Sequence, residues 1–305
     1  MGLKVGFLGL GSMGSLMAAN IARGGFRVSL YNRTRSKAES VASEVGAQVC
    51  DTPAQVARRC EVIFTMVSDS NALRDLYLGP DGISQGLWPS TTCVEMSTVG
   101  PAAIRQLCKD LMPTGARLLD IPVSGSLVLA REGKLTLMAG GSPADLEYIR
   151  PILSTMATRI FHVGPLGSGA TMKLAVNAIV YGLNAAVSEA LVLAESAGIS
   201  RETAYEIFAN SAIAAPFVQY RRDAFLHQQK VPVGFPLDLA AKDLELIQAL
   251  AAEVHAPMPQ VASNQQTLKA AVQEGRGRQD VTEIAEHLRH LRAHTRPDWV
   301  KARDN

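Results

Sequence analysis

The sequence lacks the cysteine patterns that mark metal-binding and disulfide-rich proteins. It has only four cysteines in 305 residues, and none forms a CxxC motif. They all lie in the first half of the chain, mostly beside apolar neighbours, at Cys50, Cys60, Cys93 and Cys108. We therefore expect reduced thiols in or near the core, with no metal bound through them.

Net charge and targeting signals are scarce as well. The formal net charge is only +2, so the field of the whole protein gives no reason to expect a nucleic acid or a membrane surface as partner. No cationic segment with a cleavage site follows Met1. We also expect no apolar run long and glycine-free enough to span a bilayer. These absences predict a cytoplasmic protein.

The C-terminal region carries a basic run from His287 to Arg303. His287, His290 and His294 recur there at helical spacings, but no convincing set of carboxylate or cysteine ligands accompanies them. A solvated basic helix and tail explain this run, and no metal site is predicted.

Short strand-like runs alternate with helical stretches along the first half of the chain. The strand-like runs cover residues 4–10, 27–31, 48–50, 62–67, 92–96, 117–121 and 135–139. A helical pattern fills residues 12–23 and most of the other intervals. Such alternation predicts an α/β domain with a parallel sheet covered by helices on both faces.

The second half of the chain is helical throughout. One apolar pattern runs over residues 168–197 with no proline and a single internal glycine, Gly182. Shorter helical segments follow at residues 201–211, 215–227, 238–254 and 259–274. We place the boundary between residues 164 and 165, so that residues 1–164 form the α/β domain and residues 165–305 form an all-α domain.

The first strand runs directly into a glycine-rich turn that opens a helix. The turn reads Gly9-Leu10-Gly11-Ser12-Met13-Gly14. Its glycines permit the tight turn, the close approach of a pyrophosphate and close helix–strand packing, and the helix N-terminus favours an anion. A bare GxGxxG is a weak signal, but this strand–turn–helix setting predicts a dinucleotide site.

The end of the second strand indicates which dinucleotide binds. An NAD site usually carries an acidic residue there, whereas this strand ends Asn32-Arg33-Thr34-Arg35. Arg33 can pair with a 2′-phosphate and Thr34 can donate to it, so we expect NADP, with NAD as the alternative. The other interpretation is that both arginines are solvated turn residues.

Four motifs in order resemble the β-hydroxyacid dehydrogenase family, which includes 3-hydroxyisobutyrate dehydrogenases and glyoxylate/succinic semialdehyde reductases. The resemblance covers nearly the whole chain, and four ordered motifs are more specific than any one. They are the opening signature at residues 9–20, the substrate loop at 120–126, the catalytic segment at 167–177 and the pair Lys242-Asp243. It implies a Rossmann-type N-terminal domain, a long interdomain helix, an all-α C-terminal domain and a homodimer or homotetramer.

The resemblance also assigns roles to single residues. In the family the lysine of the catalytic segment is the general acid/base and its asparagine orients the substrate, which here are Lys173 and Asn177. Cofactor contacts fall to Thr98, the threonine of an S-T-x-x-P segment, and to Lys242. Lys242 could equally be a surface lysine beside Asp243.

The substrate carboxylate is held in the family by a loop usually written D-x-P-V-S-G-G. Here Ser124, Gly125 and Ser126 occupy its last three positions. Ser126 departs from the family's glycine, so it either adds a hydrogen bond or narrows the pocket. An ordinary Ser-Gly turn is the alternative for this segment.

The chemistry of Lys173 and Asn177 agrees with the roles that the resemblance implies. They lie four residues apart on one helical pattern, so they project from the same face. A lysine beside a cationic nicotinamide has its charged form disfavoured, which suits proton transfer near neutral pH. Taken alone, Lys173 could be a solvated helix residue and Asn177 a surface amide.

These features predict an NADP-preferring oxidoreductase that interconverts a small carboxylate-bearing β-hydroxyacid and its semialdehyde or oxo acid. The substrate would be of the 3-hydroxyisobutyrate, 4-hydroxybutyrate or glyoxylate/glycolate type. Imine reductases resemble this architecture but usually replace the lysine with aspartate or tyrosine, and 6-phosphogluconate dehydrogenases usually have a much longer helical domain. A non-catalytic dinucleotide-binding module is the alternative from another class.

Overall fold

The computed structural model describes the backbone of residues 2–295 and the side chains of residues 2–292. The chain forms two compact units, one ending at Ala175 and the other beginning at Val176. The division falls inside helix α8 (Ser168–Ser196), so the first two turns of this helix belong to the first unit.

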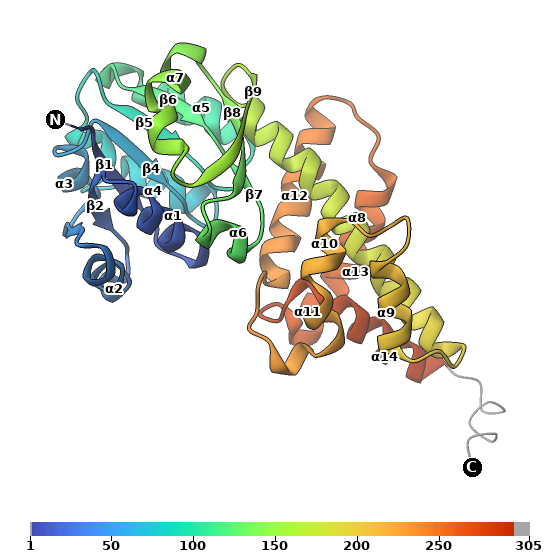
Figure 1. The fold of residues 1–305 in the computed structure, drawn as a ribbon. Coiled ribbons are helices and arrows are strands. Elements are labelled where there is room, and N and C mark those ends of the chain that lie inside the picture. The colour runs from blue at the N-terminus through green and yellow to red at the C-terminus, as the bar shows by residue number, and fades with distance from the viewer. Residues whose placement is uncertain (1, 296–305) are drawn as a thin grey trace. The chain divides into compact units, whose positions relative to one another are not determined.

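The first unit is built on a nine-stranded sheet (Figure 1). The strands are β1 (Lys4–Leu8), β2 (Arg27–Tyr31), β3 (Gln48–Val49), β4 (Val62–Thr65), β5 (Thr92–Glu95), β6 (Arg117–Asp120), β7 (Val123–Ser124), β8 (Leu135–Gly140) and β9 (Ala157–Gly164). Their order is β3-β2-β1-β4-β5-β6-β8-β7, with β9 beside β8. Strands β1 to β6 pair in parallel, as predicted.

Strand β8 differs from the predicted parallel sheet because it runs antiparallel to β6 and β7. The segment between β7 and β8 contains only the five-residue helix α6 (Leu127–Arg131). A parallel pair needs a crossover of a dozen residues or more, so this short connection turns the chain back instead. Strand β9 then returns parallel to β8 after helix α7 (Pro143–Leu153).

Helices cover both faces of this sheet because its strands carry apolar side chains on both sides. Along β1, Val5 and Phe7 join one buried cluster and Leu8 joins another, as the alternation of side chains in a strand requires. The first cluster packs against α1 (Ser12–Arg23) and α7. The second packs against α3 (Pro53–Ala57), α4 (Ser70–Leu78) and α5 (Pro101–Leu111). Helix α2 (Arg35–Val45) buries Ala38 and Val41 in the first cluster.

The second unit consists of helices in its described part. After α8 come α9 (Arg201–Ala209), α10 (Pro216–Tyr220), α11 (Arg222–Leu226), α12 (Leu237–Glu253), α13 (Pro259–Ala271) and α14 (Ile284–Thr295). The predicted helix over residues 215–227 is interrupted at Arg221, which lies between α10 and α11 and pairs with Asp280 at 2.8 Å. A Rossmann-type unit followed by an all-helical unit confirms the predicted fold class.

Helix α8 is, by length and composition alone, long and apolar enough to cross a membrane. This was not expected from the sequence, because Gly182 stood inside the apolar run. Gly182 does not end the helix, and a Cβ atom there would meet no atom closer than 3.8 Å. The helix also buries polar side chains of its own, at Asn177, Asn184 and Ser188. The core helices of soluble proteins pass the same test.

His287 is buried, so the prediction of a solvated basic helix is wrong at this residue. It is only 2% exposed, and its Nδ1 lies 3.0 Å from the carboxylate of Glu274. His290 is exposed, as expected. The side chain of His294 and residues 296–303 of the basic run lie outside the described residues.

Candidate active site

The glycine-rich turn after β1 has the shape that the sequence predicts. Gly9 has φ +94°, and a Cβ atom there would lie 2.0 Å from the carbonyl oxygen of Met66. A Cβ atom on Gly14 would lie 2.1 Å from the carbonyl oxygen of Gly9. Gly11 precedes α1, and a Cβ atom there meets nothing within 4 Å. The residues at this helix N-terminus therefore fit the pyrophosphate of a dinucleotide.

Asn32 links the end of β2 to this turn. Its Oδ1 accepts a hydrogen bond from the backbone N–H of Leu10 at 2.9 Å. Its Nδ2 donates to the carbonyl oxygen of Thr34, also at 2.9 Å. The side chain thus fixes the glycine-rich turn and the loop after β2 relative to each other.

The two arginines of this loop differ in their partners. Arg35 is ion-paired with Glu39 at 2.7 Å and with Asp51. Arg33 is exposed, and within the described chain its guanidinium has no ion-pair partner. Arg33 is therefore the arginine that remains available to an anionic ligand beside Thr34.

The predicted cofactor residue Thr98 lies in the segment that leaves β5. It is partly buried and follows Ser97, which is only 2% exposed. The Ser97 hydroxyl accepts a hydrogen bond from the backbone N–H of Val67 at 2.7 Å. This hydrogen bond joins the segments that follow β4 and β5. Both lie at the carboxyl edge of the sheet, the side at which the parallel strands end, and the glycine-rich turn lies at the same edge.

Asp120, at the end of β6, holds the start of helix α8. Its carboxylate accepts hydrogen bonds from the backbone N–H groups of Gly167 at 2.8 Å and Ala170 at 2.7 Å. Burial raises the pKa of Asp120 above its ordinary value, and these hydrogen bonds oppose the rise. A Cβ atom on Gly169 would lie 2.3 Å from the Asp120 carbonyl oxygen. The partly buried Lys173 follows less than one turn after Ala170.

The substrate-loop residues follow β7. Gly125 has φ +147°, which favours glycine, and a Cβ atom there would lie 2.8 Å from Cδ2 of Leu135. The Ser126 hydroxyl accepts a hydrogen bond from the backbone N–H of Leu129 at 3.3 Å, so it caps helix α6. The departure from the family's glycine therefore has a local structural role beside any contact with substrate.

Asn177 belongs to a buried polar cluster in the second unit. The Asp243 carboxylate, only 1% exposed, accepts hydrogen bonds from Asn177 Nδ2 at 2.8 Å and from the Tyr181 hydroxyl at 2.6 Å. The other oxygen of Asp243 lies 3.0 Å from Nζ of Lys242 in an ion pair. Burial, followed by the nearby carboxylate, raises the pKa of Tyr181 well above its ordinary value, so its hydroxyl remains a donor. This cluster fixes the direction of the Asn177 amide.

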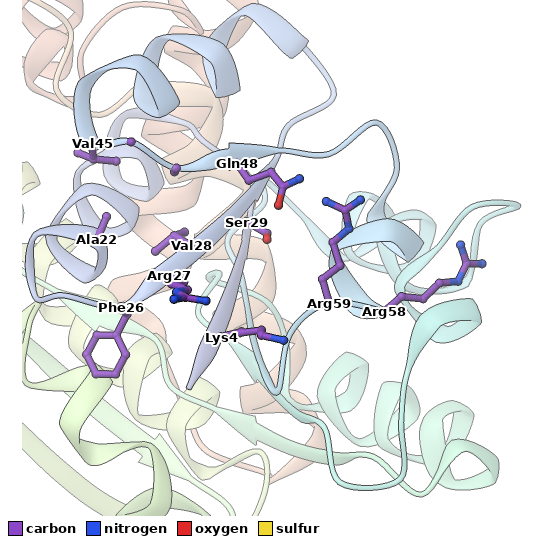
Figure 2. A pocket seen from close by; sticks show the side chains of 12 residues that line it. Lys4, Ala22, Phe26, Arg27, Val28, Ser29, Val45, Gln48, Arg58 and Arg59 are labelled. Atoms are coloured by element: carbon purple, nitrogen blue, oxygen red, sulfur yellow. The ribbon is translucent and has the colours of Figure 1, made fainter. Parts of the chain in front are cut away.

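A hollow of about 660 Å³ lies at the other edge of the sheet (Figure 2). Lys4 and Arg27, which begin β1 and β2, line it together with Arg58 and Arg59. Because β1 and β2 are parallel, this is the amino edge, whereas ligands of such sheets bind at the carboxyl ends of the strands. The hollow is therefore separate from the glycine-rich turn.

Comparison with known proteins identifies the family. Residues 4–164 match a family described as the NAD binding domain of 6-phosphogluconate dehydrogenase. Residues 167–288 match one described as NAD-binding of NADP-dependent 3-hydroxyisobutyrate dehydrogenase. Glyoxylate/succinic semialdehyde reductase 1 of Arabidopsis thaliana is 33% identical over 290 residues, which are 95% of this chain and 100% of the relative. The chain belongs to the β-hydroxyacid dehydrogenase family.

Membership of the β-hydroxyacid dehydrogenase family makes this chain an NAD(P)-dependent dehydrogenase or reductase acting on CH–OH groups. A second relative, 2-(hydroxymethyl)glutarate dehydrogenase of Eubacterium barkeri, is 33% identical and covers 92% of this chain and 93% of the relative. A third, the cytokine-like nuclear factor N-PAC of Homo sapiens, is 35% identical over 88% of this chain, but the chain spans only 48% of that relative's length.

Solved structures of β-hydroxyacid dehydrogenases share the fold. 3-Hydroxyisobutyrate dehydrogenase of Salmonella typhimurium has a TM-score of 0.87 at 24% identity, covering 93% of this chain and 99% of that chain. The Mycobacterium tuberculosis enzyme, solved with L-serine, has a TM-score of 0.80 at 26% identity, covering 95% and 100%. These structures confirm the predicted fold class, and the family models and curated relatives confirm the predicted family and general type of reaction.

Two features of this dehydrogenase were missed by reasoning from the sequence. Tyr181 supports the Asn177 amide through Asp243, and its spacing of four residues from Asn177 was a signal that could have found it. Glu95 is a fully buried acid at the end of β5. Its position two residues before Ser97 was the available signal, but its burial could not be seen in the sequence.

Proposed function

We propose that the protein is an NADP-preferring oxidoreductase that interconverts a small β-hydroxyacid and its semialdehyde or oxo acid. Relatives named for glyoxylate, succinic semialdehyde and 2-(hydroxymethyl)glutarate support this substrate class. The observation that carries the proposal is Lys173 close after a helix start that Asp120 holds with two hydrogen bonds. Those hydrogen bonds hold the backbone just before the partly buried Lys173 at the end of β6, which supports the proposal.

The cofactor would be held by the carboxyl edge of the first unit. Gly9, Gly11, Ser12, Met13 and Gly14 would receive its pyrophosphate. Asn32, Arg33 and Thr34 would hold its 2′-phosphate. Thr98 and Lys242 would make further contacts with the cofactor. When bound, the nicotinamide accepts or donates a hydride at the substrate carbon.

Lys173 would carry the proton of the reaction. In oxidation its neutral amine takes the hydroxyl proton of the substrate, and in reduction its ammonium returns a proton to the carbonyl oxygen. Asn177 would orient the substrate oxygen with an amide whose direction is set by Asp243. A group oriented in advance loses little entropy when the reaction occurs.

Ser124, Gly125 and Ser126 would bind the substrate carboxylate. A backbone at φ +147° and a serine hydroxyl can both present donors to an anion at the end of β7. Ser126 already accepts a hydrogen bond from Leu129, but its hydroxyl hydrogen can still be donated to a substrate oxygen.

We also propose a cytoplasmic homodimer or homotetramer with domains at residues 1–164 and 165–305. Leu193 on α8 is 72% exposed, which supports subunit packing along this helix. Measuring the mass of the purified protein in solution tests the assembly directly.

The test of the proposed activity is a panel of initial rates. NADPH and NADH oxidation would be followed with succinic semialdehyde, methylmalonate semialdehyde, glyoxylate, an aldehyde that lacks a carboxylate, and a cyclic imine. We expect NADPH-dependent turnover only of the carboxylate-bearing compounds. Turnover of the imine alone would favour an imine reductase, and NADPH binding without turnover of any compound would favour a dinucleotide-binding module.

A further inference from the structure

Glu95 is a buried acid without a basic partner. Its side chain is only 1% exposed, and within the described residues it forms no ion pair. Placing a carboxyl group in an apolar interior is costly unless hydrogen bonds compensate for the lost water. The contacts that it makes therefore show what the group does in this fold.

Both carboxyl oxygens of Glu95 bind groups at the carboxyl edge of the sheet. Oε1 accepts a hydrogen bond from the backbone N–H of Ser97 at 2.7 Å. Oε2 accepts one from the hydroxyl of Thr65, the last residue of β4. Glu95 thus joins the ends of two neighbouring strands and fixes the segment that carries Ser97 and Thr98.

Ser97 passes this constraint on to the glycine-rich turn. Its hydroxyl accepts a hydrogen bond from the backbone N–H of Val67 at 2.7 Å. Met66, the residue before Val67, packs against Gly9 of the turn. A Cβ atom on Gly9 would lie only 2.0 Å from the Met66 carbonyl oxygen. A continuous path of close contacts therefore runs from the Glu95 carboxyl group to the backbone of the turn.

We propose that Glu95 is a positioning residue that sets cofactor affinity by holding the Ser97–Thr98 segment and, through Ser97 and Met66, the glycine-rich turn. The inference rests on the proposed function, since it takes this edge as the NADP site. Nothing in it requires Glu95 to contact cofactor or substrate, because the carboxyl group is buried beneath the edge.

The protonation of Glu95 makes its role measurable. Burial raises the pKa of Glu95 to about 7, and the hydrogen bonds from Ser97 and Thr65 oppose that rise. The groups that face it are the carboxylate of Asp120, the thiol of Cys93 and the hydroxyl of Tyr77. Burial raises the pKa of Cys93 to about 12 and that of Tyr77 well above its ordinary value, so neither changes charge near neutral pH.

The test is fluorescence titration of NADPH binding to the full chain at several values of pH between 6 and 8. The variants are Glu95→Ala, Glu95→Gln and Ser97→Ala. Thr92→Val is the matched control, because Thr92 lies on the same strand and its buried hydroxyl has no partner. Rates at saturating NADPH would be measured in parallel, together with the melting temperature.

We expect Glu95→Ala and Ser97→Ala to raise the Kd for NADPH roughly tenfold, the usual effect of losing a buried hydrogen bond to an ionisable group or of leaving an N–H unsatisfied. We expect kcat at saturating NADPH to change less than threefold. Glu95→Gln keeps an acceptor for the Ser97 N–H, and its amide NH2 can donate to the Thr65 hydroxyl in place of the bond that Thr65 donates to Glu95. Its affinity should therefore stay near wild type and lose the part of the pH dependence that Glu95 contributes. Thr92→Val should bind as wild type does.

Wild-type affinity in folded Ser97→Ala and Glu95→Ala proteins would overturn the inference, and so would an unchanged pH profile in Glu95→Gln. Because Glu95→Gln and Ser97→Ala are small changes, they test the inference even if Glu95→Ala does not fold. Absence of NADPH binding in the wild-type protein would instead overturn the proposed function, so the two failures are distinguishable.

Discussion

At the scale of single residues, the two arginines after β2 differ in whether an acidic side chain of the protein pairs with them. Arg35 is engaged by Glu39 and Asp51, whereas Arg33 has no ion-pair partner within the described chain. A guanidinium that is not engaged elsewhere can pair with a phosphate through two parallel hydrogen bonds. The choice between NADP and NAD should therefore depend on Arg33.

Replacing Arg33 with glutamine should raise the KM for NADPH roughly ten- to a hundredfold, the usual contribution of charge-assisted hydrogen bonds. The KM for NADH should change little, because NADH has no 2′-phosphate. Arg35→Gln is the control, and it should leave the preference unchanged. Equal losses of NADPH and NADH affinity in Arg33→Gln would contradict this assignment.

The buried acid Glu95 should make the stability of the protein depend on pH. Its pKa is raised to about 7 in the folded state from 4.5 in the unfolded chain, so the folded protein holds an extra proton between these values. The contribution of Glu95 to the free energy of unfolding is therefore fully present below pH 4.5. It is lost as the pH rises through 7, and the loss is about 3 kcal/mol at most.

Glu95→Gln should remove this contribution, because an amide does not titrate. The free energies of unfolding of wild type and variant would be measured in denaturant at pH 5 and pH 8. The stability of the variant relative to wild type should be greater at pH 8 than at pH 5. A difference that is equal at both values would show that Glu95 remains ionised in the fold.

At the scale of elements, helix α8 contains two glycines with opposite surroundings. A Cβ atom on Gly169 would lie 2.3 Å from the carbonyl oxygen of Asp120 and 2.5 Å from that of Met138. Backbone atoms of neighbouring strands cannot yield easily to such a contact. A Cβ atom on Gly182 would lie 3.8 Å from the side chain of Asn264, an ordinary van der Waals distance.

Gly169→Ala should therefore destabilise the protein by roughly 2 kcal/mol or more, as overpacking of a close contact does. Gly182→Ala should stabilise it by about 0.5 to 1 kcal/mol, because alanine favours a helix interior. Thermal unfolding of the two variants beside wild type measures both effects. A Gly169→Ala protein as stable as wild type would contradict the close contact with Asp120.

The helices and strands predicted from the sequence agree best with the structure where a local sequence pattern determines the conformation. The helix at residues 12–23 and the strand at residues 27–31 are found with the predicted bounds. The direction of β8 was not predictable from its own residues, since an antiparallel strand depends on the short connection before it. The break at Arg221 likewise depends on a partner distant in sequence, Asp280.

At the scale of the whole molecule, motifs were readable from the sequence but the groups that hold them were not. Lys173 and Asn177 could be proposed because their spacing matches the catalytic segment that the family resemblance supplies. The burial of Glu95 and the contacts of Asp243 could not be found in this way, because both depend on residues far away in the chain. The substrate loop shows the same limit, since the capping role of Ser126 depends on where α6 begins.

The most direct test of the role of Lys173 is the effect of Lys173→Ala on turnover and on NADPH binding. Lys269→Ala is the matched control, since Lys269 is a lysine on α13 that pairs with Glu245 at 3.5 Å. We predict that Lys173→Ala lowers kcat with a carboxylate-bearing aldehyde by about a hundredfold or more while NADPH binds as it does to wild type. A Lys173→Ala protein that keeps most of its turnover would contradict the claim that Lys173 carries the proton.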